Sequence, residues 1–598
     1  MHNYIKSALL IIFAFTLSAC NDGFLNLLPE TEIGKENFFK SEEDLSIYLN
    51  NLYDFPGTGI YTADQGTDNS ATTGNLEIKT IMTTNASSAT IIGGWSWERL
   101  RTINFFLENF GGADIPQEAL NHYEGIARFF RARFYMDMVM RYSDVPYYDK
   151  VLETDDTDEL FKGRDSREMV VAKIFEDYAF AAEHVYATQP AGAVNQWVVK
   201  SYQARHALVE GTYRKYHPEL NLASSADEFI QLAGNVAKEI MDSGQYALHS
   251  TGNPATDYAA LFSNADLSSN SEVILANLSI ANLKNSGSSS FMFGNFEVSP
   301  VRDLLQAYVM TDGTYYADQA DIETKLFVEE FENRDLRLSQ SYAFPGWELY
   351  RTSTYSQGAT NYVQQLQKNF SGYHQIKGFV NNPDQEAIDN VDVPVIRYAE
   401  ILLIFAEAQA ELGQLTQGDL DLTVNALRDR VGTSTMLLNP AVDPVQQARY
   451  PSVSNANLLE IRRERRIELA FEGFRLTDIM RWGAGELLEK EPEGLYFPSL
   501  GKYDLTGDGV DDIYLIDQSE AIPAGADKEI NSLGVSLTYY RAGTQGQDAS
   551  VYLANGNSGT IQTVAERGTF QSPMHYYRPI PQTHVTINPN LTQMFGWE

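Results

Sequence analysis

Apolar side chains recur at helical spacing along much of the chain, and the pattern is clearest between Val395 and Trp482. From Val395 to Gly413, two apolar stripes run side by side and leave only a narrow strip of polar positions. One stripe contains Tyr398, Ile401, Phe405, Ala408 and Leu412, and the other contains Ala399, Leu402, Ala406 and Ala410. This spacing predicts a helix, and two adjacent stripes predict one that other helices cover on most sides.

A second helix is predicted from Asp419 to Arg430, after a turn that begins at Gly413, because glycine beyond the last apolar position commonly ends a helix. Two helices joined by a turn within about 35 residues match one tetratricopeptide unit, although any antiparallel pair gives this spacing. Further helices are predicted at Glu42–Tyr53, Glu98–Phe110, Leu120–Met140, Glu168–Ala187, Trp197–Tyr216 and Ala226–Ser243. The predicted fold class is mainly α, a tetratricopeptide-like helical superhelix in one globule, with loop-rich insertions and a mixed C-terminal part.

A third helix, from Leu458 to Arg475, is dense in arginine and glutamate at spacings of three and four residues. Such a run is either a solvent-exposed helix with ion pairs along its surface or a basic patch for nucleic acid. We favour the exposed helix, because each arginine has a glutamate nearby and the chain carries a net charge of −36. That charge also argues against nucleic acid or anionic lipid as a partner, since both are negative themselves.

These segments resemble the signature sequences of the SusD/RagB family. The matching stretches here are Val395–Leu403, Ala406–Ala408, Arg462–Arg475 and Arg481–Gly483. Similar stretches at Phe24–Pro29, Asn37–Phe39, Arg131–Pro146, Tyr577–Pro581 and Asn588–Thr592 extend the resemblance over essentially the whole mature chain. The resemblance implies a surface glycan-binding lipoprotein of Bacteroidetes nutrient uptake and polysaccharide utilisation. The implied partner is a SusC-type TonB-dependent outer-membrane transporter, to which the oligosaccharide or polysaccharide is delivered.

The N-terminus has the features of a lipoprotein signal peptide, predicted to comprise residues 1–19 and to be cleaved. Lys6 supplies the positive charge, Ala8 to Leu17 the apolar stretch, and Leu17-Ser-Ala-Cys20 the cleavage site. These ten apolar residues are too few to span a bilayer, which takes about 20. Cys20 is the only cysteine, so lipid attachment is favoured over a free thiol. We expect a lipid-anchored protein of the outer membrane, and the resemblance adds exposure at the cell surface.

Composition divides the mature chain into two parts, predicted to pack as one globule. Residues 20–245 form the N-terminal SusD-like helical part, and residues 246–598 form the C-terminal SusD/RagB part. In the first part, a stretch from residue 56 to 88 is rich in Gly, Thr, Asn, Asp and Ser, which predicts a long exposed loop of the kind that often carries function. In the second, helical periodicity is patchy from 246 to 393 and from 492 to 569, and Val273–Ala276 is a candidate strand.

No catalytic motif is found in the sequence. It contains no Gly-x-Ser-x-Gly, no phosphate-binding glycine loop, no His-Glu-x-x-His and no cysteine cluster. We therefore predict non-catalytic binding and no enzyme. A glycoside hydrolase with a pair of catalytic carboxylates stays open as an alternative, because 80 acidic residues offer many pairs. A peptide-binding RagB-like nutrient lipoprotein and a helical-repeat scaffold stay open as well.

Two regions offer the residues that sugars need, since sugar rings stack their C–H faces on aromatic rings and their hydroxyl groups need polar partners. The candidate ligand-binding residues are Trp95, Trp97, Asp64, Asp68, Asn69, Trp347 and Tyr350. The first five lie in or just after the polar stretch, and the last two lie in the loop-rich part. The resemblance supports the first region, because a Trp-x-Trp before this helix recurs in similar proteins. A core role competes at each position, although two tryptophans two residues apart are not both expected to be buried.

A short acidic loop is a candidate metal site. It places Asp504, Thr506, Asp508 and Asp512 at positions 1, 3, 5 and 9 of a glycine-containing segment, a spacing at which a hard cation such as calcium collects oxygen ligands. The loop departs from a full EF-hand at Thr506 and at Leu515, where a bidentate glutamate is expected. A calcium site and an acidic hairpin turn therefore fit the sequence equally well.

Overall fold

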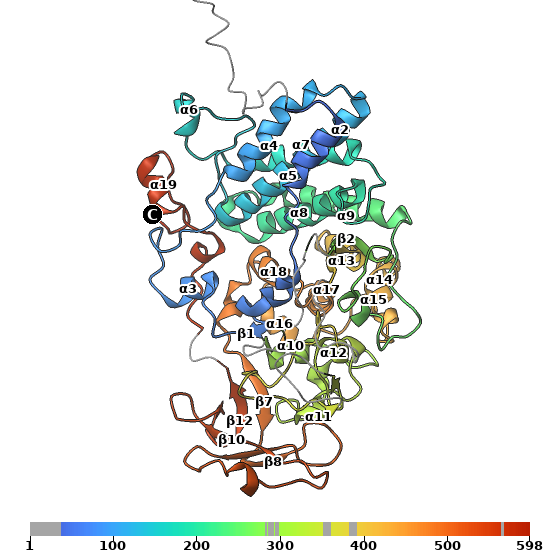
Figure 1. Ribbon diagram of the computed structural model, residues 1–598, viewed down its shortest axis with the longest axis vertical. Helices are drawn as coiled ribbons and strands as arrows, with labels where there is room; N and C mark the ends of the chain where they lie inside the picture. Colours follow the sequence, from blue (N-terminus) through green and yellow to red (C-terminus); the bar gives the residue numbers. More distant parts are fainter. Residues whose placement is uncertain are drawn as a thin grey trace, which may run out of the picture.

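The computed structural model describes residues 38–280, 298–350, 360–381, 391–563 and 567–598, together with Lys284 and Met292. The predicted signal peptide, Cys20 and the stretch Phe24–Pro29 lie outside the described residues. Among the described helices, none is both long enough and apolar enough to cross a membrane. Helices fill the upper and middle parts of the molecule in Figure 1, and a strand-rich part forms its lower end.

The molecule is mainly helical, as predicted. Its longest helices form pairs in the first half of the chain, where α5 (Gln117–Tyr142) packs on α7 (Arg167–His184) and α8 (Gln196–Tyr216) packs on α9 (Ala226–Asp242). The other α-helices are α2 (Glu42–Asn50), α3 (Glu77–Thr83), α4 (Glu98–Asn109), α6 (Thr157–Leu160), α10 (Arg302–Ala307), α11 (Phe327–Glu330), α12 (Leu336–Ser341), α13 (Tyr398–Glu411), α14 (Gln417–Leu422), α15 (Val424–Arg430), α16 (Pro444–Arg449), α17 (Ala456–Glu468), α18 (Arg475–Arg481) and α19 (Gln582–Ile587).

Helix α13 is enclosed by other helices, as its two apolar stripes predict. It contacts α8, α9 and α17, and every residue from Ala399 to Ala408 is buried. The main hydrophobic core combines distant parts of the chain, among them Phe130, Phe405 and Tyr577. The helix begins later than predicted because the preceding residues form strand β6 (Val393–Arg397), which pairs antiparallel with β2 (Val273–Asn277). The strand predicted around Val273–Ala276 is thereby confirmed.

Helix α17 is buried along its length, so the prediction of a solvent-exposed helix is wrong. Its charged side chains pair with residues distant in the sequence. Glu468 lies 2.8 Å from Arg337, 2.6 Å from Arg397 and 2.7 Å from Arg430, and we call these four residues the buried ion-pair cluster. Burial acts to raise the pKa of Glu468, but the three guanidinium groups outweigh it and hold that pKa well below its usual range. The charges are accommodated inside the protein because each has opposite partners.

Two predicted helices are interrupted. The one predicted from Asp419 to Arg430 breaks at Thr423, which has φ of −125° and ψ of −93° and separates α14 from α15. The one predicted from Leu458 to Arg475 ends at Glu468, and Phe471, with φ of 61°, turns the chain toward α18. The first break lies at the start of Thr423, Val424 and Asn425, which have low helix propensity, and the second lies close to Gly473, so local propensity contributes to both interruptions.

The stretch from residue 56 to 88 is not a long exposed loop, and that prediction is wrong. It contains the 3₁₀ helix η3 (Thr58–Gly66), the short strand β1 (Ser70–Ala71) and α3. Strand β1 pairs antiparallel with β3 (Ser299–Pro300), and the Asp64 side chain accepts a hydrogen bond of 2.9 Å from the Phe471 N–H. Asp64 and the polar residues from Thr67 to Ser70 are buried and form hydrogen bonds in the interior, whereas Thr73, Asn75 and Thr83–Asn85 are exposed.

The C-terminal part is mixed, as predicted. Its strands are β7 (Glu493–Phe497), β8 (Gly501–Tyr503), β9 (Ile513–Asp517), β10 (Thr538–Gly543), β11 (Val551–Tyr552) and β12 (Gly559–Gln562). Four of them form a sheet in the order β11-β10-β9-β8, in which β10 runs parallel to β9 and β11, and β7 pairs antiparallel with β12. Ile513, Leu515 and Tyr540 from this sheet enter a second hydrophobic core that also contains Phe327.

Candidate functional site

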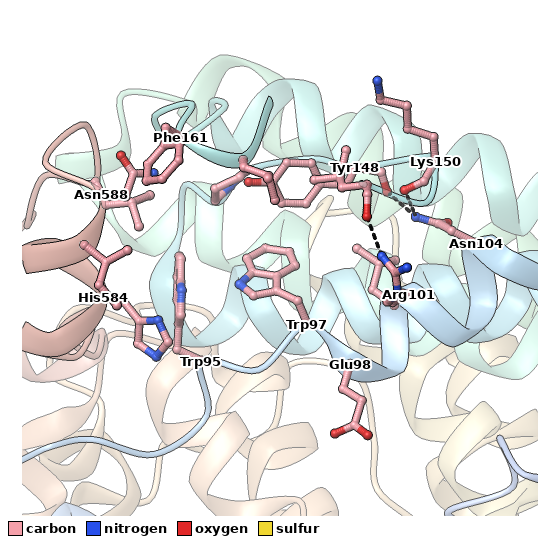
Figure 2. A pocket seen from close by; sticks show the side chains of 16 residues that line it. Trp95, Trp97, Glu98, Arg101, Asn104, Tyr148, Lys150, Phe161, His584 and Asn588 are labelled. Carbon is pink, nitrogen blue, oxygen red and sulfur yellow. Dashed lines mark hydrogen bonds between the residues drawn. The ribbon is translucent and has the colours of Figure 1, made fainter. Parts of the chain in front are cut away.

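A hollow of about 480 Å³ opens where the start of α4, the segment around Tyr148 and helix α19 meet (Figure 2), and we call it the aromatic pocket. Its lining residues are Trp95, Trp97, Glu98, Leu100, Arg101, Asn104, Pro146, Tyr148, Lys150, Leu152, Leu160, Phe161, His584, Ile587, Asn588 and Leu591. Aromatic and aliphatic side chains dominate this lining, with a few charged and amide groups among them. This composition is typical of sites for small ligands.

The two tryptophans are placed by the backbone that leads into α4. Gly94 has φ of 89°, and a Cβ atom there would come within 2.4 Å of the Arg141 side chain, so this turn requires glycine. Trp97 is the N-cap residue of α4. The rings of Trp95 and Trp97 meet edge to face, with centroids 5.4 Å apart and planes at 84°, an arrangement that aromatic pairs prefer. Trp95 is only 7% exposed and Trp97 is half-buried, in agreement with the expectation that the two are not both buried.

Tyr148 adds a third ring to the pocket. It lies edge to face against Trp97, with centroids 5.3 Å apart. The backbone of Tyr148 is held by Tyr135, whose hydroxyl accepts a hydrogen bond of 2.6 Å from the Tyr148 N–H and donates one of 3.0 Å to the Tyr148 carbonyl. Burial raises the pKa of the Tyr148 phenol to about 12, so this ring is neutral at physiological pH and presents an uncharged hydroxyl group.

Asn104, Arg101 and Lys150 supply polar groups at one end of the pocket (Figure 2). The Asn104 amide donates to the carbonyls of Tyr148 and Lys150, at 3.0 and 3.1 Å, which fixes that segment. Arg101 lies 4.0 Å from Glu153 and donates to the Leu152 carbonyl, and more than half of the Arg101 side chain is exposed. Ion pairs this exposed are weak, so the guanidinium group is also available to oxygen atoms of a ligand.

The opposite wall comes from α19 and the residues after it. The imidazole of His584 lies 6.5 Å from the Trp95 ring, centroid to centroid. This wall is anchored by two amides, because Asn588 donates to the Lys162 carbonyl at 2.9 Å and Asn590 donates to the Phe161 carbonyl at 2.7 Å. Sequence reasoning missed Tyr148, Phe161 and His584, since they lie in separate segments with no shared local pattern.

Asp64, Asp68 and Asn69 do not line the aromatic pocket, so the structure does not bring them together with Trp95 and Trp97. All three are buried, with exposures of 1%, 5% and 0%. Asp68 accepts two hydrogen bonds of 2.7 Å from Arg475 and also contacts Arg466 and Arg449. Burial acts to raise the pKa of Asp68, but the three guanidinium groups hold it well below its usual range. These contacts stabilise the interior, and a role of the three residues in ligand binding stays a prediction.

Trp347 and Tyr350 also lie away from the aromatic pocket, since neither is among its lining residues. Trp347 is half-buried against Tyr362, with ring centroids 5.8 Å apart. Between Trp347 and Tyr350, the short strand β4 (Glu348–Leu349) pairs with β5 (Thr360–Asn361), and the Tyr350 N–H donates to the Asn381 side chain at 3.1 Å. The structure therefore separates the two predicted aromatic regions.

The acidic loop has the hydrogen bonds of a hairpin turn. Asp504 accepts from the N–H groups of Gly507 and Gly509, at 2.6 and 2.8 Å, and Asp512 accepts from Leu505 and Thr506, at 2.8 and 2.9 Å. Asp508 accepts from the Val510 N–H at 2.8 Å. Across the described residues, no three His, Cys, Asp or Glu side chains are grouped to hold a metal ion. These contacts favour the turn, and the calcium site stays an untested prediction.

Treatment with a chelator distinguishes the two interpretations of the acidic loop, a hairpin turn and a calcium site. We expect a chelator to leave the melting temperature unchanged, whereas Asp504→Ala should lower the free energy of unfolding by about 1 to 2 kcal/mol because two backbone N–H groups lose their acceptor. Asp508→Ala, which frees a single N–H group, serves as the control and should cost less. A melting temperature that falls with chelator in the wild type but not in Asp508→Ala would support calcium instead, because a ligand of the folded state stabilises it.

Comparison with known proteins gives a consistent result. Residues 264–597 match the model of the SusD family. SusD-like protein P2 from Formosa agariphila is 23% identical over 496 residues, which cover 79% of this chain and 90% of that protein. A SusD-like protein from Bacteroides fragilis has a TM-score of 0.65 at 20% identity, covering 95% of this chain and 100% of that one. A SusD-like carbohydrate binding protein from the same species has the same TM-score at 22% identity, covering 93% and 100%. At these identities the solved structures show a shared fold.

Proposed function

Because this chain belongs to the SusD family, we propose that it binds an oligosaccharide or a segment of a polysaccharide in the aromatic pocket and does not cleave it. The observation that carries this proposal is the edge-to-face pair of Trp95 and Trp97 in a hollow with polar groups at its ends. The apolar C–H face of a sugar ring stacks on the accessible face of Trp97. The sugar hydroxyl groups then reach the polar side chains at the ends of the pocket, such as Arg101 and Lys150.

The lining of the pocket supports binding without hydrolysis. A glycoside hydrolase of the usual kind needs two carboxylic acids that flank the scissile bond, one as acid and one as base or nucleophile. Glu98 is the only carboxylate among the lining residues, and it belongs to the first turn of α4. The pocket therefore lacks the second carboxylate that this chemistry requires.

Calorimetry against a panel of neutral and acidic oligosaccharides tests the function. We expect at least one of them to bind, and incubation of the protein with that oligosaccharide should release no reducing ends above a heat-inactivated control. Reducing ends that accumulate with time, and disappear in Glu98→Gln, would overturn the binding role and restore the hydrolase hypothesis. Failure of every oligosaccharide to bind, while a peptide library yields ligands, would favour a peptide-binding nutrient lipoprotein.

We propose further that the protein is anchored by lipid at Cys20 in the outer membrane and delivers its ligand to a SusC-type transporter. The lipobox Leu17-Ser-Ala-Cys20 supports the anchor, and family membership supports the transporter. In cells without that transporter, Cys20→Ala should move the protein out of the membrane fraction, because acyl chains on this cysteine supply the attachment. Ser18→Ala, which keeps the cysteine, is the control and should stay with the membranes. A Cys20→Ala protein that stays in the membrane fraction rules out the anchor.

A further inference from the structure

A second large hollow lies between α10, α16 and α17. Its volume is about 550 Å³, and it shares no lining residue with the aromatic pocket. We call it the α10–α16 groove, and its walls include Asp303, Gln306, Tyr316, Ala448, Arg449 and Arg466. Helices α10 and α16 lie in the middle of Figure 1, well apart from α19 at its left side and from α4 above. The two hollows are thus independent places on the molecule.

Four hydrogen-bond donors in the walls of the groove lack partners. They are the side-chain amide nitrogen Nε2 of Gln306, the hydroxyl of Tyr316, Nε of Arg449 and Nη1 of Arg466. None of these atoms has a hydrogen-bond partner in the described structure, although all are shielded from solvent. Tyr316 is 2% exposed and Arg466 is 3% exposed. Native proteins rarely leave buried polar groups unpaired, so these four donors are free to bind an acceptor that enters the groove once the side chains turn toward it.

The charges of the groove are already balanced by the protein. Arg449 contacts both Asp303 and Asp68, and Arg466 lies 3.3 Å from Asp303. Lys490, at the edge, lies 3.7 Å from Asp303. A strongly anionic ligand would therefore have to displace these carboxylates, whereas a neutral ligand rich in oxygen would add acceptors without adding charge.

Part of the groove is apolar and open. Pro444, Val445 and Ala448 of α16 line it and are exposed, with 46% of Val445 accessible. Donors in one wall and apolar side chains in another match the two surfaces of a sugar ring, which has hydroxyl oxygens at its edge and C–H groups on its faces. The Tyr316 hydroxyl and the Gln306 amide adjust by rotation about their last torsions when an oxygen enters.

We propose that the α10–α16 groove is a second saccharide site, which binds an uncharged sugar segment through the unpartnered donors of its walls and the apolar face of α16. The ligand class rests on the proposed function, but the residues of the groove are separate from those of the aromatic pocket. Two sites on one chain hold a polysaccharide at two points, which raises the overall affinity through effective concentration.

Calorimetry with linear, uncharged oligosaccharides of glucose, mannose and xylose tests the second site. The wild type should bind two molecules per chain of an oligosaccharide too short to span both sites. Ala448→Trp fills the groove from an exposed position and should remove one of the two binding events. Ala441 is also exposed but lies outside the groove, so Ala441→Trp should remove neither. Trp97→Ala should remove the other event and leave the groove intact.

Gln306→Leu provides a second variant, because it keeps the size of the side chain and removes the amide. Since its Nε2 has no partner in the described structure, the melting temperature should not fall, while binding in the groove should weaken by roughly tenfold. A purely structural role for Gln306 predicts the opposite, a lower melting temperature with unchanged binding.

The outcomes separate the two proposals. If the wild type binds one ligand per chain and Trp97→Ala abolishes all binding, water alone fills the groove. That result overturns the second site. Full binding in Trp97→Ala and none in Ala448→Trp overturns the aromatic pocket and retains the groove. If no uncharged oligosaccharide binds the wild type, the groove proposal is wrong, and acidic oligosaccharides still test the pocket.

Discussion

Replacing Glu468 by alanine should lower the free energy of unfolding by about 3 to 5 kcal/mol. Glu468 is fully buried and lies within 2.8 Å of three guanidinium groups, those of Arg337, Arg397 and Arg430. The substitution leaves these three cations inside the protein with fewer opposite charges. A buried cation without sufficient compensation is among the most destabilising features that a single substitution creates. Chemical denaturation followed by circular dichroism measures the loss.

A matched control uses the same substitution at an exposed ion pair. Glu176 lies 2.8 Å from Lys173 on α7, and 60% of its side chain is exposed. Solvent screens such a pair, so Glu176→Ala should cost less than about 1 kcal/mol. Equal losses for Glu468→Ala and Glu176→Ala would mean that the buried ion-pair cluster does not stabilise the fold.

Replacing Trp97 by alanine should weaken oligosaccharide binding by about 2 kcal/mol or more, roughly thirtyfold or more, because central aromatic contacts dominate binding energy at many interfaces. Trp97 is half-buried and lies between Trp95 and Tyr148, so of the two tryptophans its ring is the more accessible to a ligand. Calorimetry with an oligosaccharide that binds the wild type measures the change.

The design must separate lost contact from lost structure. Trp95 is a poorer probe, because it is buried and packs against Tyr142 with ring centroids 4.9 Å apart, so Trp95→Ala disturbs the core as well. Trp347→Ala is the matched control, since Trp347 is also half-buried but lies outside the pocket. If Trp347→Ala abolishes binding and Trp97→Ala has no effect, both with wild-type melting temperatures, the ligand binds near Trp347 and the pocket is misassigned.

Helix α13 and helix α17 show what periodicity does and does not predict. The two apolar stripes of α13 predict that other helices cover most of its surface, because the burial of apolar side chains is favourable. In α17, Arg463 and Glu460 form the pair at a spacing of three that the sequence pattern predicts. Arg465 and Glu468 instead pair with Asp478 and with Arg397, respectively, which come from other elements. A pattern of charged residues shows that they need oppositely charged partners. It does not show whether those partners come from the same helix or from distant segments in the interior.

The candidate site is predicted from sequence only in part, for a similar reason. Trp95 and Trp97 stand out because two large aromatic residues before a helix are conspicuous in any sequence. Asp64 and Asp68 are chosen for their proximity in the sequence to these tryptophans, yet they point into the interior, where Phe471 and Arg475 hold them. Tyr148 reaches the pocket because the segment after α5 folds back over α4, where Asn104 fixes it. The tertiary fold determines which distant residues lie close together, and a single sequence does not allow these contacts to be predicted.

The wall formed by α19 also determines the stage of synthesis and folding at which the pocket is complete. The lining residues His584, Ile587, Asn588 and Leu591 are synthesised after every other residue that lines the pocket, and Leu591 is also the last residue of the main hydrophobic core. During synthesis, α4, α5 and the segment around Tyr148 can pack before α19 is made. At that stage the pocket lacks the wall formed by α19. It encloses a ligand only after the residues near 590 have folded back onto Phe161. If the ligand binds in this pocket as proposed, its binding reports complete folding and distinguishes finished molecules from those in which the helices alone have formed.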